Sequence, residues 1–125
     1  MLRQVWINGW EMQCCGDPFR VGDRAEFTTT TDVDREFLSA VVGGERAVAL
    51  TDCEDRHGLV RGSMSTVAGT VLSIEAVSCR YELRKGAMYP VPGTTRLAWR
   101  DEATGWEPEV AEVRFVGYVV RVRAN

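Results

Sequence analysis

The chain has 125 residues, of which 45% are hydrophobic and 26% are charged. This length suits a single domain over residues 1–125, and the composition is that of a globular protein rather than a disordered or fibrous one. The net charge is −3, and acidic and basic residues are interleaved along the chain. Nucleic-acid binding usually needs a basic stripe, so these features argue against it.

The N-terminal segment, residues 1–10, has no apolar run of the length that a signal peptide needs. No later stretch approaches the length of a membrane span. We therefore expect a cytoplasmic protein that is not inserted in a membrane. In a reducing compartment the four cysteines are expected to be thiols. They are Cys14, Cys15, Cys53 and Cys79.

The first segment alternates in polarity, which predicts a strand with four side chains on one face. These side chains are Trp6, Trp10, Met12 and Cys14. Turn residues at 16–18 end this strand, and a second strand is predicted over 25–29.

Residues 33–42 form the one pattern that predicts a helix, because their apolar side chains recur at helical spacing. Residues 31–32 offer an N-cap, and the glycines at 43–44 predict its end. A short buried strand is then expected over 47–51.

Two later segments alternate in polarity but change phase partway. In the first, the apolar side chains change face between Ala76 and Val77. In the second, the change falls at Gly117. One extra residue in a strand produces such a slip, which predicts a β-bulge or a bend in each strand.

Bent strands are typical of a sheet that curls on itself. With a turn-rich connection at 89–93, a further strand at 95–99 and an acidic loop at 101–108, the chain is predicted to have about six strands and one helix. The predicted class is mainly β, a small curled antiparallel sheet forming an SH3-like or OB-like barrel. The pattern does not choose between these two barrels. Its predicted core includes Ile74, Val77, Tyr81, Phe115 and Val120.

Several short segments resemble an uncharacterised actinobacterial family of small domains. The distinctive one is the Cys-Cys-Gly-x-Pro-Phe segment, residues 14–19, and the others lie at 10–13, 21–23, 57–58, 69–71, 79–81, 105–106 and 115–118. Because that family has no assigned function, the resemblance implies no catalytic residue, substrate or cofactor.

A zinc site is the sharpest alternative that the residue types offer. Its candidate ligands are Cys14, Cys15, His57 and Cys79, with Cys53 four residues before the histidine. Zinc ribbons hold the metal with paired Cys-x-x-Cys segments, which this chain lacks. Packing of the thiols in the core is therefore favoured, and no metal or other cofactor is predicted. A small metal- or thiol-dependent enzyme using this cluster remains the alternative function.

Trp99 and Trp106 flank the acidic loop, where large aromatic side chains can present a surface to a peptide, ligand or subunit. Phosphate-loop and dinucleotide motifs are absent from the sequence. We therefore predict a non-enzymatic binding or assembly module with a protein or small-molecule partner. The sequence leaves its ligand and its oligomeric state open.

Overall fold

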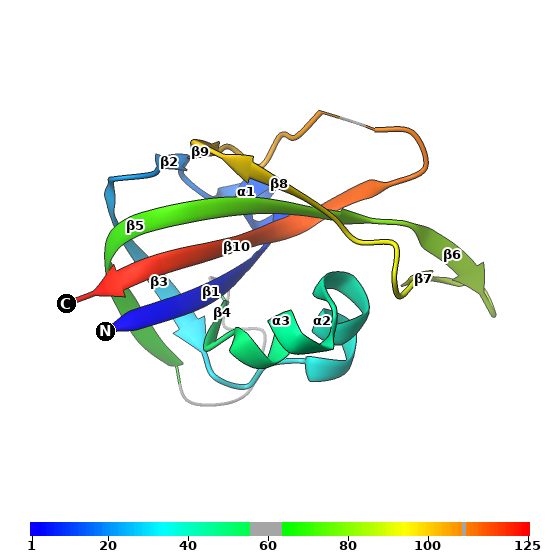
Figure 1. Ribbon diagram of the computed structural model, residues 1–125, viewed down its shortest axis with the longest axis horizontal. Coiled ribbons are helices and arrows are strands. Elements are labelled where there is room, and N and C mark those ends of the chain that lie inside the picture. The colour runs from blue at the N-terminus through cyan, green and yellow to red at the C-terminus, as the bar shows by residue number, and fades with distance from the viewer. Residues whose placement is uncertain (56–63, 109) are drawn as a thin grey trace.

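The computed structural model describes residues 1–55, 64–108 and 110–125 (Figure 1). Its strands are β1 (Leu2–Asn8), β2 (Phe19–Arg20), β3 (Arg24–Thr30), β4 (Asp52–Glu54), β5 (Met64–Cys79), β6 (Tyr81–Arg84), β7 (Ala87–Pro90), β8 (Arg96–Arg100), β9 (Glu102–Ala103) and β10 (Arg114–Ala124). Its helices are α1 (Gly9–Cys15), α2 (Arg35–Val42) and α3 (Gly44–Ala49). The predicted mainly β class is confirmed.

Five strands close into a barrel in the order β10, β1, β4, β3 and β5, and β5 pairs back onto β10. The neighbouring strands are antiparallel except β1 and β4, which are parallel. Strand β8 extends the sheet by pairing with the second half of β5. The predicted small curled antiparallel sheet is thus a closed barrel, and the further strand expected near 95–99 is β8.

The pairing of β5 with β10 contains the two irregularities that let these long strands curl. One shift lies between Phe115 and Gly117, which confirms the bend predicted there. The other leaves Leu72 as the extra residue of β5, so the predicted slip between Ala76 and Val77 was misplaced. Residues 74–77 are all buried because both faces of β5 are covered there. A run of buried apolar residues looks in the sequence like a change in the phase of alternation.

The barrel wall separates two hydrophobic clusters. The inner cluster includes Val5, Ile7, Phe27, Val71, Ile74, Tyr118, Val120 and Val122. The outer cluster, between the wall and helices α2 and α3, includes Trp6, Leu38, Val41, Leu50, Val77, Cys79 and Val119. Three of the predicted core residues are buried, whereas Tyr81 and Phe115 pack against the clusters and are only partly buried.

Helix α1 replaces the second half of the strand predicted over the first segment. Strand β1 follows β10 only as far as Asn8, whose partner is Gly117 beside the bulge. At the next residue the backbone meets the ring of Phe115, since a Cβ added to Gly9 would lie 2.6 Å from a ring carbon. The chain turns there into a helix that buries Met12 and leaves Trp10 exposed.

Helix α3 occupies the place of the strand expected over 47–51. Ala47 and Leu50 both face the outer cluster, and their spacing of three puts them on one face of a helical turn, whereas in a strand they would point to opposite faces. The predicted helix is confirmed as α2, and Gly43 ends it with a φ of 91°, a conformation that favours glycine.

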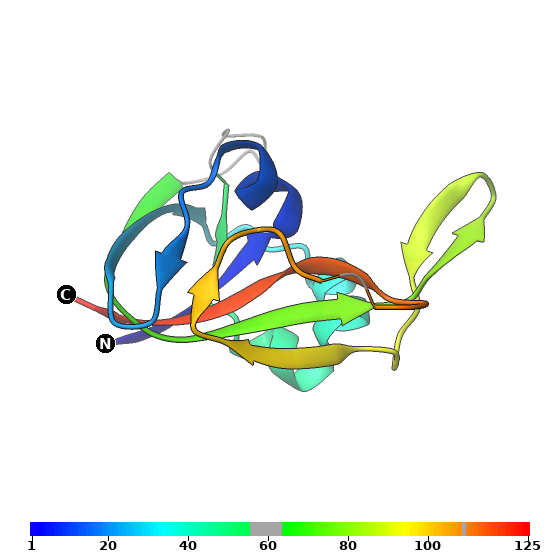
Figure 2. The same ribbon diagram turned by 90° about the horizontal axis from the view of Figure 1, so that it is seen from above.

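Strands β6 and β7 form a separate hairpin that projects from the barrel beyond α2 (Figure 2). Its turn is made by Lys85 and Gly86, both with positive φ, as tight hairpin turns require. Across the described part of the chain, no helix has the length and apolar character needed to cross a membrane.

Candidate functional site

Two side chains hold helix α2 at its N-terminus, and this decides which side chains it offers to solvent. The carboxylate of Asp34 caps its N-terminus by accepting a hydrogen bond of 3.0 Å from the backbone N–H of Phe37. Arg35 turns toward α3 and donates to the carbonyl oxygens of Ala47 and Leu50, the latter at 3.3 Å. Phe37 is left partly buried at the margin of the outer cluster.

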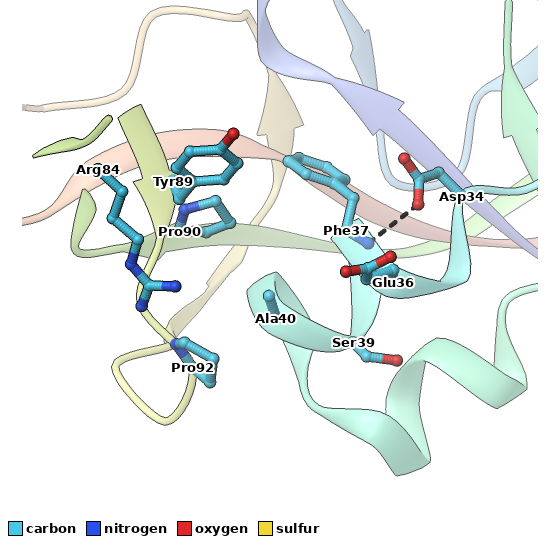
Figure 3. A pocket seen from close by; sticks show the side chains of 9 residues that line it. All are labelled: Asp34, Glu36, Phe37, Ser39, Ala40, Arg84, Tyr89, Pro90 and Pro92. Atoms are coloured by element: carbon cyan, nitrogen blue, oxygen red, sulfur yellow. Dashed lines mark hydrogen bonds between the residues drawn. The ribbon is translucent and has the colours of Figure 1, made fainter. Parts of the chain in front are cut away.

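A hollow of about 640 Å³ lies between α2 and the β6–β7 hairpin (Figure 3). Phe37 and Ala40 line it from the helix, and Tyr89, Pro90 and Pro92 line it from the hairpin and the segment after it. Tyr89 is 48% exposed, so its ring is available to a ligand. The volume and the mainly apolar lining are typical of a binding site.

Two more hollows meet the first one at Phe37, which lines all three. One, of about 370 Å³, lies between α2, β1 and β4 and reaches Cys53. The other, of about 440 Å³, runs past Tyr81 to the exposed ring of Trp10 on α1. We call the three together the α2 groove. Each hollow has aromatic side chains in its lining: Phe37 lines all three, together with Tyr89 in the first, Trp6 in the second, and Trp10 and Tyr81 in the third.

Acidic side chains predominate along the helix side of the α2 groove. Asp32, Asp34 and Glu36 line the hollows, and Asp34 already uses one oxygen as the helix cap. The cation on the hairpin wall, Arg84, forms an ion pair with Glu82.

In the third hollow, which Trp10 also lines, the guanidinium of Arg114 lies over the ring of Tyr81, 5.8 Å from its centroid. A cation in this position is attracted to the face of the ring. The two cations of the groove therefore lie in different hollows, Arg84 in the first and Arg114 in the third.

The thiol in the floor of the groove is unsuited to nucleophilic chemistry. Burial raises the pKa of Cys53 to about 12, and the negative charges of Glu11, Asp55, Glu54 and Asp34 add to this increase. The thiol is therefore protonated at neutral pH, and only the thiolate is a good nucleophile. The structure gives Cys53 the character of a packed, inert side chain.

The cysteines of the alternative zinc cluster have separate environments in the described part of the chain. Cys79 is buried in the outer cluster, as expected of a packed thiol, and burial raises its pKa. Cys14 and Cys15 lie exposed at the end of α1 and are joined in a disulfide, so the prediction of four thiols is wrong for this pair. His57 falls outside the described residues. Among the residues that the structure describes, no group of three or more Cys, His, Asp and Glu side chains is placed to hold a metal ion.

Trp99 and Trp106 are exposed, at 66% and 71%, but neither belongs to the described lining of the α2 groove. Trp99 borders a separate hollow of about 320 Å³, beside the ion pair of Arg46 with Glu75 at 2.5 Å. Trp106 lies in the loop after β9.

Sequence reasoning missed the groove because Phe37 counted only as one of the apolar residues at helical spacing and Tyr89 fell in a turn-rich connection. The Tyr-Pro-Val-Pro run at 89–92 is the signal that could have indicated it. An aromatic ring beside two prolines is an unusually rigid apolar surface for a connection between strands.

Comparison with known proteins gives a family and no function. Searches of curated proteins and of solved structures find no significant match. A family model described as a family of unknown function, DUF6578, matches residues 1–124. This agrees with the expectation of a family without assigned function. The chain therefore belongs to the family of unknown function DUF6578.

Proposed function

We propose that this chain is a non-enzymatic binding module that holds a segment of a partner protein in the α2 groove. The observation that carries the proposal is that Phe37 lines three adjoining open hollows, each with further aromatic side chains in its lining. An extended peptide can occupy several adjoining open hollows, whereas a small metabolite needs to be enclosed on most sides.

The exposure of the aromatic side chains supports this function. Tyr89 and Trp10 are each about half exposed. Rigid aromatic side chains bury a large area at little cost in conformational entropy, so they often dominate binding interfaces. Covering Tyr89 with a partner would remove its exposed ring from water.

The chemistry of the cysteines favours binding over catalysis. A thiol-dependent enzyme needs an accessible thiolate, but burial and nearby carboxylates keep Cys53 protonated, and Cys79 is buried. We propose the cytoplasm as the place where the module works; the free thiols of Cys53 and Cys79 support this compartment, and the disulfide of Cys14 with Cys15 opposes it.

The test is to pan a phage-displayed library of random dodecapeptides against the immobilised chain. We expect enriched peptides whose synthetic forms lose at least tenfold in affinity for the Tyr89→Ala variant, since loss of a central aromatic contact commonly has an effect of this size. Trp99→Ala is the matched control, because it removes an exposed aromatic side chain outside the groove.

Two results would contradict the proposal. One is a panning that enriches no peptide sensitive to Tyr89→Ala. The other is a set of peptides that depend on Trp99 instead, which would place the binding surface on β8. Far-ultraviolet circular dichroism of both variants checks that each is folded.

A further inference from the structure

We infer that the segment held in the α2 groove is cationic, with a Lys or Arg side chain beside the start of α2 and apolar residues against the hairpin. This inference rests on the proposed function and specifies the chemistry of the partner.

The described lining of the groove carries a small net negative charge after its own cations are counted. Asp32, Asp34 and Glu36 supply three carboxylates, and Arg84 and Arg114 supply two cations. Arg84 also forms an ion pair with Glu82, a further carboxylate on the hairpin. The N-terminus of a helix carries a partial charge of roughly +0.5, which offsets only part of this excess.

Arg35 does not neutralise these carboxylates by contact, although it is their neighbour in sequence. Its guanidinium donates to carbonyl oxygens at the end of α3, on the side away from the hairpin. Glu36 is exposed, and no ion pair of the described residues involves it. A basic side chain from a ligand would therefore gain attraction without displacing an existing ion pair.

The walls fix where the apolar part of the ligand would lie. Tyr89, Pro90 and Pro92 form a rigid apolar wall that faces Phe37 and Ala40 of α2, and Asp34 and Glu36 lie beyond Phe37 at the start of the helix (Figure 3). A ligand with apolar side chains between these walls and a basic side chain near the start of α2 would satisfy both features at once. The ring of Tyr89 would also attract a nearby cation through its face. A nucleic acid or an anionic ligand would instead meet like charge along α2.

The test uses two fluorescein-labelled, end-capped nonapeptides, one with three Pro-Leu-Lys repeats and the other with three Pro-Leu-Glu repeats. Proline keeps both extended, leucine supplies the apolar contact, and the charge alone differs. In fluorescence anisotropy at low ionic strength we expect the lysine peptide to bind about three- to tenfold more tightly, as two or three exposed charge pairs allow. Added salt should reduce this preference through screening.

The matched variants separate local charge from net charge. Asp32→Asn with Glu36→Gln removes two groove carboxylates but keeps the helix cap, so it should abolish most of the preference. Asp17→Asn with Glu26→Gln removes the same total charge from exposed positions outside the described groove lining and should leave the preference intact.

Equal or tighter binding of the glutamate peptide would overturn the inference, and so would an equal loss of preference in both double variants. Failure of both nonapeptides to bind would overturn it as well. If panning yields peptides that depend on Tyr89 but contain no Lys or Arg, the charge inference is wrong while the proposed function stands. If panning yields no such peptide, the proposed function itself is wrong.

Discussion

The hydroxyl of Tyr118 makes the sharpest stability prediction, because it joins the barrel interior to the loop after β9. Tyr118 is buried, its oxygen accepts a hydrogen bond of 3.0 Å from the backbone N–H of Gly105, and it donates one of 2.8 Å to Glu107. Tyr118→Phe removes both bonds and leaves their partners shielded from water. A hydrogen bond between neutral groups contributes about 1 kcal/mol to the free energy of unfolding, and a hydrogen bond to a charged group contributes about 1.5–3 kcal/mol.

Arg100 still holds the other oxygen of Glu107 at 2.6 Å, so the loss at this carboxylate is partial. We therefore expect Tyr118→Phe to lower the free energy of unfolding by about 2–3 kcal/mol, measured by urea unfolding at pH 7. A loss below about 0.5 kcal/mol would show that the hydroxyl does not bridge the loop and the barrel.

The same substitution should change the dependence of stability on pH. Burial and the bond to Glu107 raise the pKa of Tyr118 to about 12, from its ordinary value of 10. The folded state thus holds the proton more tightly, and this stabilisation is present below pH 10 and is lost as the pH rises toward 12. The stability difference between the wild-type chain and Tyr118→Phe should therefore narrow above pH 10. A difference that stays constant to pH 11.5 would refute this assignment.

Two further predictions concern the cysteines and the bulge of β10. Without reductant, the unfolded chain should show two titratable thiols, Cys53 and Cys79, and four after reduction; a count of four without reductant would contradict the disulfide in α1. In the native state at pH 8, both thiols should react slowly, because burial raises the pKa of each. Gly117→Ala should cost several kcal/mol in urea unfolding, since its Cβ would lie 2.3 Å from the carbonyl oxygen of Ile7; an unchanged midpoint would mean that β1 does not pass so close to β10.

Parts of the fold could be predicted because the relevant physics is local. The helix at α2 follows from apolar residues at helical spacing ahead of Gly43, and the bend of β10 follows from the change of phase at Gly117. The bend of β5 lies at Leu72, but the sequence pattern placed it at Ala76. The reason is that polar and apolar residues no longer alternate in a strand that is buried on both faces.

The candidate site could not be predicted, because its parts come from segments far apart in the sequence. Phe37 reads as a core residue on a helical face, and only the position of the hairpin shows that this ring is the meeting point of three hollows. Trp99 and Trp106 are exposed as expected, yet the fold places both outside the described lining of that groove.

The sequence by itself determined the mainly β class, helix α2 and the absence of a basic stripe. These features follow from the order of apolar and polar residues and from the positions of the charged ones. The tertiary structure alone decided that the strand of the first segment ends at Asn8, because the ring of Phe115 meets the backbone at Gly9. It also decided that the hairpin lies across from α2, and hence that a groove exists. Closure of a barrel sets such contacts through pairing between distant strands, which no local pattern of residues encodes.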